Sequence, residues 1–466
     1  MAKKIYSRRE FIKKNSLTGL GTFMAMNATT HAMFSQIQTD TLKPAILGGS
    51  PVRNKPWPVW PMWSTETDEK KVIDVLRSGV WCRAGVREDV SVVAEFEKKW
   101  AETIGSKRCL AVVNGTNSLI ISLKMLEIGG GDEVIVTPYT FIATISAILE
   151  TGAMPVFADV DPETFQINPE NIRKKITPRT RAILPVHILG LPCDMDPIME
   201  IARQHKLLVV EDACQAWLAE YDNRKVGTIG NAGCFSFQNS KHLAIGEGGA
   251  IVSDDDEFMD KCHSYHDTGR RYGQMADLVG GVYVIRGNNL RMTEYQAAIG
   301  ISQLRRLDEQ TSLRNRNAAY LSSRLSAIPG ILPYKLYPKV TRASFHLFPF
   351  RYKKEEFSNM TRQEFLRAIG AEGVRGSGGY SGNLNMMPYL DDTFRTKNYQ
   401  LMYPAETLNY ESFIEQNRCP ESERLCNEEA IWFFQSMLLG DYSDLDDIYN
   451  AIEKVHKNSA RIKAGL

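Results

Sequence analysis

Three short segments of the chain combine residue types that could act together on one bound cofactor. Residues 208–215 form an apolar run that ends in Glu211-Asp212 and reaches Gln215. Residues 114–118, Asn-Gly-Thr-Asn-Ser, follow another apolar run and open a helix-like stretch. Residues 234–241 read as a strand that ends in a loop with Lys241, and Gly246-Glu247-Gly248-Gly249 follows.

These residue types match the requirements of pyridoxal phosphate chemistry. A lysine can hold an aldehyde as an imine, and a carboxylate can keep a pyridine nitrogen protonated. The N–H groups at a helix N-terminus can bind a phosphate. We therefore expect Lys241 to carry the cofactor, Asp212 to face the ring nitrogen and Gln215 to reach the ring hydroxyl.

Each segment alone also has a simpler interpretation. An acidic residue often ends a strand, and Thr, Asn and Ser are common helix caps. A single lysine is usually a solvated surface residue. The prediction therefore depends on the combination of the three segments in this order.

The surrounding elements predict a fold that would bring the three segments together. Short apolar runs, typical of buried strands, lie at 109–113, 134–137, 155–158, 182–186 and 207–210. Helix-like stretches alternate with them at 117–127, 142–149, 170–176 and 195–205. This alternation favours an α/β fold with a mostly parallel sheet covered on both faces, and ligands bind beyond the carboxyl ends of such strands.

The remainder of the chain suggests an arm, a long helix and a smaller α+β domain. Residues 56–63 predict an extended arm with aromatic anchors, and 293–328 one long helix ended by Pro329-Gly330. Beyond it we expect a strand at 347–352, placed at a sheet edge by Pro349, and a Gly-rich loop at 375–382. The predicted division is a signal segment (1–35), an arm with a large cofactor domain (36–328) and a small domain (329–466).

Composition excludes several classes of protein. The 466 residues are 43% hydrophobic and 24% charged with a net charge of +1, so no basic surface for nucleic acid is expected. Eight cysteines show no metal-ligand or disulfide spacing, and we expect no metal. No later stretch is apolar enough to span a bilayer.

The N-terminus predicts export. Residues 7–13, Ser-Arg-Arg-Glu-Phe-Ile-Lys, match the twin-arginine consensus, and a weakly apolar stretch at 17–32 follows. A basic, disordered tail is the alternative. The protein is therefore expected in the periplasm, or in the cytoplasm if the signal does not function.

The motifs resemble those of the DegT/DnrJ/StrS family of sugar aminotransferases, which are fold-type I pyridoxal phosphate enzymes. The family's E-D-A-A-Q stands here at 211–215, its G-x-F-S-F-x-x-x-K at 233–241, and its G-x-N-x-R-M-T-E-x-Q-A-A-I-G at 287–300. The likeness covers nearly the whole chain after residue 46.

The resemblance implies a role for each matched residue. Lys241 would hold the cofactor and move the proton, Asp212 would pair with the ring nitrogen, and Gln215 would contact the ring hydroxyl. The remaining roles would be phosphate binding by Thr116, Asn117 and Ser236, ring stacking by Phe141, and substrate contact by His187 and Tyr380. Asn289 would reach the phosphate in a neighbouring subunit, which implies a homodimer with shared active sites.

Residues 237–241, 246–249, 47–53 and 419–423 resemble the branch that contains glutamine:scyllo-inosose aminotransferases and aminohydroxybenzoate synthases. Leu189 and Leu290 depart from the residues usual in relatives, which leaves the substrate open. This branch implies amino transfer from glutamine or glutamate to a keto-sugar or keto-cyclitol. The predicted substrate is not linked to a nucleotide, since Arg375 is the only arginine in the Gly-rich loop and a diphosphate needs cationic partners.

Two alternatives remain at this point. A sugar dehydratase of the same family would use a histidine in place of the lysine, and His242 is adjacent to Lys241. An exported, non-catalytic sugar-binding or sensor protein could share the fold. A Rossmann-type dehydrogenase is set aside, since no G-x-G-x-x-G follows the early strands.

Overall fold

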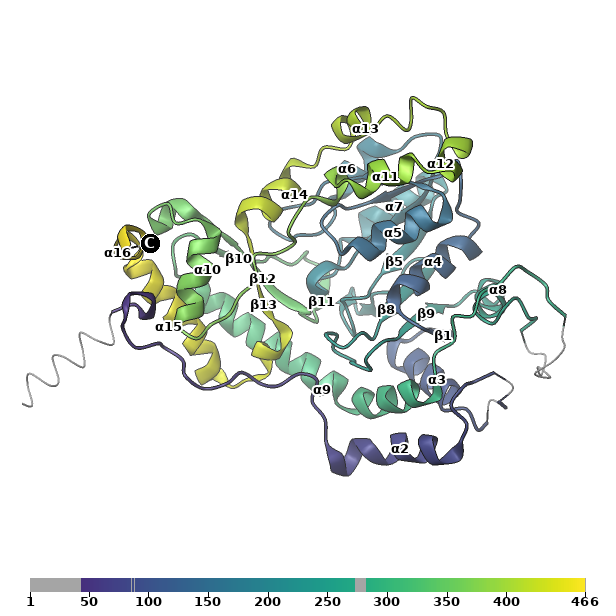
Figure 1. Ribbon diagram of the computed structural model, residues 1–466, viewed down its shortest axis with the longest axis horizontal. Helices are drawn as coiled ribbons and strands as arrows, with labels where there is room; N and C mark the ends of the chain where they lie inside the picture. The colour runs from purple at the N-terminus through teal and green to yellow at the C-terminus, as the bar shows by residue number, and fades with distance from the viewer. Residues whose placement is uncertain (1–42, 85, 88, 273–281, 466) are drawn as a thin grey trace, which may run out of the picture.

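The computed structural model describes residues 43–84, 86–87, 89–272 and 282–465 (Figure 1). The predicted twin-arginine signal lies outside these residues. Within them, no helix combines the length and the apolar character needed to cross a membrane.

A seven-stranded sheet forms the centre of the large lobe. In spatial order its strands are β1 (Arg108–Val112), β9 (Gly249–Ser253), β8 (Ala232–Ser236), β5 (Leu208–Asp212), β4 (Thr180–Leu184), β2 (Glu133–Val136) and β3 (Met154–Phe157). All neighbouring pairs from β8 to β3 are parallel, and β9 runs antiparallel to both of its neighbours. The prediction of a mostly parallel sheet is confirmed.

Helices cover both faces of this sheet, as parallel strands that are buried on both sides require. Val134 and Val136 of β2 belong to the same apolar cluster as residues of α4 (Gly115–Met125) and α5 (Ile142–Thr151). Ile135 points the other way, into a cluster that includes residues of α3 (Val92–Ile104) and α7 (Met195–His205). Two further helices flank the sheet, α6 (Pro169–Lys175) and α8 (Asp256–His266).

Helix α9 (Glu294–Leu325) is unbroken and runs along one side of the molecule (Figure 1). It packs on α2 (Thr65–Ser78) and α3 at one end and on α15 (Tyr442–Lys457) towards the other. The side chain of Glu294 accepts hydrogen bonds from Ser91 Oγ (2.8 Å) and Val93 N (2.9 Å), which joins the starts of α9 and α3. The helix ends three residues earlier than predicted, and Gly330 (φ 81°) turns the chain into the C-terminal lobe.

The C-terminal lobe, residues 331–465, contains an antiparallel sheet in the order β10 (Ile331–Pro333), β12 (Leu347–Tyr352) and β13 (Ala430–Phe434). Helices α10 (Arg362–Ala371), α15 and α16 (Ser459–Gly465) accompany it. A third, small antiparallel sheet, β11 (Val340–Arg342) with β6 (Glu220–Tyr221) and β7 (Arg224–Lys225), joins the lobes. One apolar cluster runs through both lobes, so the boundary after residue 328 stays a prediction.

The expected edge position of β12 is wrong, because β12 is the central strand of its sheet. Pro349 pairs with Trp432 of β13, whereas β10 pairs only with residues 350–352. The proline therefore has a strand neighbour on one side only, and its missing N–H costs no hydrogen bond to β10.

Residues 384–424 of the C-terminal lobe extend over the large lobe beside α5 and α6 (Figure 1) and reach edge strand β3. They contain the short helices α11 (Tyr389–Phe394), α12 (Lys397–Met402), α13 (Tyr410–Gln416) and α14 (Pro420–Arg424). Asn417 Oδ1 accepts from the backbone N–H of Phe157 in edge strand β3 (2.8 Å), so a group that would otherwise be unpaired is satisfied.

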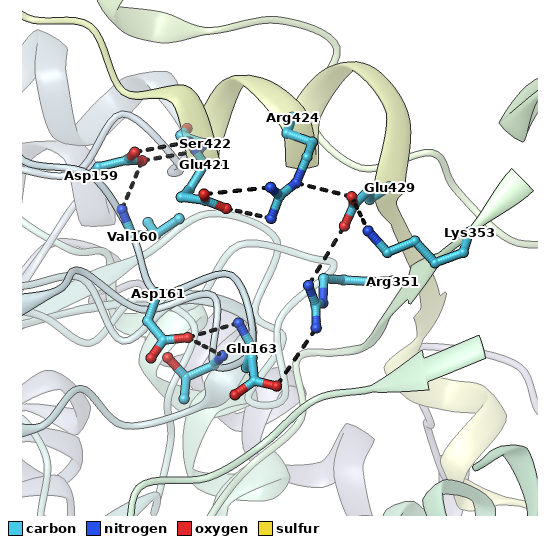
Figure 2. Close-up of polar contacts among 11 residues, drawn as sticks. Asp159, Val160, Asp161, Glu163, Arg351, Lys353, Glu421, Ser422, Arg424 and Glu429 are labelled. Carbon is cyan, nitrogen blue, oxygen red and sulfur yellow. Dashed lines mark hydrogen bonds and ion pairs between the residues drawn. The ribbon is translucent and has the colours of Figure 1, made fainter. Parts of the chain in front are cut away.

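A chain of charged groups continues this connection (Figure 2). Asp159 accepts the backbone N–H groups of Glu421 (2.8 Å) and Ser422 (2.9 Å). Arg424 bridges Glu421 and Glu429, and Glu429 also contacts Lys353 and Arg351. Burial raises the pKa of Asp159, against the lowering effect of its backbone hydrogen bonds.

Candidate active site

A cavity of about 580 Å³ opens at the carboxyl ends of β4, β5 and β8, where an α/β sheet binds its ligands. The starts of α4 and α5 form part of its wall, and the C-terminal lobe closes it with His346, Leu347, Tyr380 and Trp432. Seven of the predicted residues line it: Thr116, Phe141, Asp212, Gln215, Ser236, Lys241 and Tyr380.

Lys241 presents its amine to this cavity from the loop after β8. Its Nζ lies 3.5 Å from His346 Nε2 and 5.9 Å from the centre of the Trp217 ring. Burial lowers the pKa of Lys241, although Cys214 and Asp212 act in the opposite direction. A lowered pKa increases the fraction of neutral amine, which is the nucleophilic form that attacks an aldehyde.

Asp212 stands at the end of β5 with only 5% of its surface exposed. Its carboxylate accepts the hydroxyl of Thr144 (2.8 Å) and the backbone N–H of Cys214 (3.1 Å). Thr144 in turn lies 2.9 Å from the hydroxyl of Thr140. The two donors fix the direction of a buried carboxylate that forms no ion pair with any described residue, so it is available to a protonated pyridine nitrogen.

The start of α4 provides a cradle for a phosphate. Asn114 caps the helix by accepting the N–H of Asn117 (2.9 Å), and the N–H groups of Gly115 and Thr116 donate to no acceptor among the described residues. A Cβ on Gly115 would lie 2.7 Å from Ser236 Cβ and 2.9 Å from Cys214 Sγ. Only glycine therefore leaves room at this point, and the residues present fit a phosphate bound by backbone N–H groups.

The flat part of a cofactor would lie between apolar side chains. Phe141, which precedes α5, is 58% exposed although it lines the cavity, and Val186 belongs to the same wall. Gln215 donates from Nε2 to the hydroxyl of Tyr380 (3.2 Å) and accepts the N–H of Leu189 with Oε1 (2.9 Å). Burial raises the pKa of Tyr380, so its hydroxyl remains protonated.

Three predicted residues lie elsewhere. Asn117 donates its side-chain amide to Asn114 (3.0 Å), so it serves the helix cap. Asn289 pairs with Asp267 in an isolated bridge away from the cavity, and its predicted role in a neighbouring subunit stays a prediction. His187 is fully buried beneath the site and does not line the cavity.

Both ring nitrogens of His187 are engaged, which leaves neither for the predicted substrate contact. Nδ1 accepts the N–H of Cys193 (3.0 Å), so the proton is on Nε2, which lies 3.0 Å from Glu211 Oε2. Glu211 also accepts three backbone N–H groups from Gly227, Ile229 and Gly230. Burial opposes ionisation of Glu211, but the bond to His187 and these N–H groups outweigh it and lower its pKa.

Sequence reasoning missed several residues of the site, above all Thr144, His346 and Trp432. Thr144 stands four residues after Thr140, one helical turn, and this spacing was its only local signal. His346 directly precedes β12 and Trp432 lies in β13, both more than 100 positions after Lys241, so only the docked lobe places them here. Burial, together with the positive charges of Lys241 and Arg314, lowers the pKa of His346 well below its usual value.

The neighbour of the lysine, His242, does not face the cavity. It is 1% exposed, and its Nε2 lies 3.3 Å from the carbonyl of Phe345. Lys241 therefore occupies the position of the reactive group, and the arrangement does not support the histidine of a dehydratase. Among the described residues, no three His, Cys, Asp or Glu side chains form a group that could hold a metal ion.

Comparison with known proteins agrees with this geometry. The chain belongs to the DegT/DnrJ/EryC1/StrS aminotransferase family, which residues 63–414 match. It is 36% identical over 431 residues to a Micromonospora echinospora protein described as an L-glutamine:3-amino-2,3-dideoxy-scyllo-inosose aminotransferase, covering 91% of this chain and all of that one. Over 429 residues it is 34% identical to the L-glutamine:2-deoxy-scyllo-inosose aminotransferase of Streptomyces kanamyceticus, covering 90% and 98%.

Solved structures share the fold as well. The crystal structure of 3-amino-5-hydroxybenzoic acid synthase matches with a TM-score of 0.73 and 28% identity, covering 88% of this chain and 100% of that one. DesI, crystallised in the presence of its TDP-sugar product, matches with a TM-score of 0.71 and 26% identity, covering 90% and 97%. The family to which this chain belongs is one of aminotransferases, and one of these similar structures, DesI, has a nucleotide-linked sugar as its product.

Proposed function

We propose that this protein uses pyridoxal 5'-phosphate to transfer an amino group from glutamine or glutamate to a keto-cyclitol or a free keto-sugar. The observation that carries the proposal is one cavity that combines the Lys241 amine, the buried Asp212 carboxylate and the free N-terminus of α4. When bound, the cofactor supplies an aldehyde for the lysine and a ring that accepts electrons from the donor's α-carbon.

The chain's own residues would bind and orient the cofactor and cover its ring. Asp212, directed by Thr144, would hold the ring nitrogen in its protonated form, and the start of α4 with Ser236 would bind the phosphate. Phe141 would cover one face of the ring. Lys241, once released, would hold and move the proton at its Nζ, since its lowered pKa suits it to act as a base.

The charge of the cavity favours a substrate without a diphosphate. Its charged lining groups are Asp212, Lys241 and Glu247, and no arginine of the described chain lines it. Arg375, the arginine of the Gly-rich loop, is exposed and does not line it either. The relatives that act on scyllo-inosose derivatives support a cyclitol ketone in particular.

The substrate proposal is tested by competition. Glutamine would be the donor, and 2-deoxy-scyllo-inosose and a simple 3-keto-hexose would compete with a nucleotide-linked 4-keto-hexose. The proposal predicts a higher kcat/KM for the free ketones. A clear preference for the nucleotide-linked sugar would contradict it.

We also propose a homodimer with shared active sites. Large apolar side chains are exposed on α2, on the segment after it and at the start of α9: Ile73, Leu76, Val80, Trp81, Val90 and Tyr295. The N–H of Glu294 donates to the carbonyl of Trp81 (3.0 Å), so two of these segments are adjacent. An apolar surface of this kind marks an interface, and a second copy would bring Asn289 towards the cavity of the first.

Export by the twin-arginine pathway is the proposal for localisation, supported by the consensus match at 7–13. Replacing both arginines of a full-length reporter fusion by lysine should abolish its appearance in the periplasm. Unchanged export would contradict the proposal.

A further inference from the structure

Two tryptophans of the N-terminal arm make the same type of contact with different parts of the molecule. Trp57 donates from Nε1 to the carbonyl of Gly373 (3.1 Å), and the guanidinium of Arg53 lies 3.6 Å from the centre of its ring. Trp60 donates from Nε1 to the carbonyl of Lys241 (3.2 Å), and the guanidinium of Arg314 lies 5.2 Å from its ring centre. The arm therefore reaches the backbone of the proposed cofactor lysine.

The hydrogen bond from Trp60 secures the lysine on its C-terminal side. On the other side, the N–H of Lys241 donates to the carbonyl of Gln238 (2.8 Å), which closes a tight turn. Within the described residues, Trp60 is the only donor to the Lys241 carbonyl. Without this bond, only the loop's own hydrogen bonds would hold the backbone of Lys241 in position.

Arg314, in the middle of α9, forms no ion pair with any residue that the structure describes. It is fully buried, donates from Nε to Gln435 Oε1 (2.8 Å), and has no hydrogen-bond partner for its other two guanidinium nitrogens in the described structure. Burial lowers its pKa to about 9, so it remains charged at neutral pH. A buried cation without a carboxylate is costly, and the face of the Trp60 ring gives it an attractive contact.

We propose that Trp60 is a positioning residue for Lys241 and that Arg314 holds its indole in place. Trp60 does not line the cavity, so it would act through the lysine and not on the substrate. The inference rests on the proposed role of Lys241. It assigns the arm a function beyond packing, because docking of the arm would set the direction and basicity of the reactive amine.

The chain offers a matched pair of variants. Trp60→Phe and Trp57→Phe each keep an aromatic ring and remove one N–H donor. Trp60→Phe should weaken binding of pyridoxal 5'-phosphate about fivefold, the equivalent of one neutral hydrogen bond, and shift the pH midpoint of the bound cofactor's absorbance spectrum. Trp57→Phe should leave the cofactor affinity and the pH midpoint unchanged, although its melting temperature should fall about as much as that of Trp60→Phe.

Wild-type affinity and midpoint in Trp60→Phe would overturn the proposal, and so would equal changes in both variants, which would indicate a general loosening of the arm. If Trp60→Phe does not fold, Arg314→Lys replaces it and should shift the midpoint in the same direction by a smaller amount. Failure of the proposed function is a separate result: borohydride would then fix no cofactor on Lys241 of the wild-type protein.

Discussion

Replacing Asp212 with asparagine should abolish most of the activity and leave the fold intact. The two present partners of the carboxylate, the Thr144 hydroxyl and the Cys214 N–H, both donate to it. An asparagine oxygen can still accept one of them. The Thr144 hydroxyl can rotate to accept from the new amide, because a hydroxyl both donates and accepts.

The fold therefore loses little stability, whereas the ring nitrogen loses an ionised partner, the carboxylate of a residue that is only 5% exposed. Removal of an electrostatic partner of this type costs roughly 100-fold to 1,000-fold in kcat, or about 3–4 kcal/mol. Thr144→Val keeps the charge of Asp212 and removes one hydrogen bond to it, worth about 1.5–3 kcal/mol. The kcat of this variant should therefore fall less, by roughly 10-fold to 100-fold.

The assay is the steady-state rate with glutamine and 2-deoxy-scyllo-inosose, accompanied by the melting temperature of each variant. Thr151→Val is the matched control on the same helix, because the Thr151 hydroxyl donates to the carbonyl of Ile148 (2.7 Å) and accepts the N–H of Ala153 (3.3 Å), both away from the site. A turnover near that of the wild type in a folded Asp212→Asn protein would refute the assignment.

The phosphate cradle, the buried amine of Lys241 and the proposed dimer can each be tested. Gly115→Ala should weaken cofactor binding at least tenfold, since its Cβ would lie 2.7 Å from Ser236 Cβ; equilibrium titration with pyridoxal 5'-phosphate checks this, and unchanged affinity would show that the cradle is not used. Because burial lowers the pKa of Lys241, the rate at which the apoprotein captures the cofactor should reach its plateau at a lower pH than the rate for a free lysine amine, and equal midpoints would contradict this. Mixing inactive Lys241→Ala with inactive Asn289→Ala should restore activity through hybrid dimers, whereas a monomer in size-exclusion chromatography would argue against shared sites.

The sequence predicted the parts of the site that lie close together along the chain. Apolar runs beside turn residues indicated the positions of β5, β8 and the start of α4. Because parallel strands end at the same edge of a sheet, these segments were expected to meet there. Asp212, Ser236 and Lys241 therefore lie where their spacing indicated.

Long-range packing was not predictable in this way. His346 and Trp432 enter the cavity because β12 and β13 pair with each other, and nothing in their local sequence identifies the cavity they face. Pro349 favoured an edge strand, but the shortness of β10 accommodates it in a central one. His187 carried a motif that suggested substrate contact, whereas its bond to the buried Glu211 makes it a structural support.

Whether Lys241 carries the cofactor can be measured directly. The purified protein would be saturated with pyridoxal 5'-phosphate, reduced with borohydride, digested and analysed by mass spectrometry. We expect a pyridoxyl-phosphate adduct on Lys241 and no visible absorbance band in folded Lys241→Ala. An adduct on a different lysine, or an unchanged band in that variant, would contradict it.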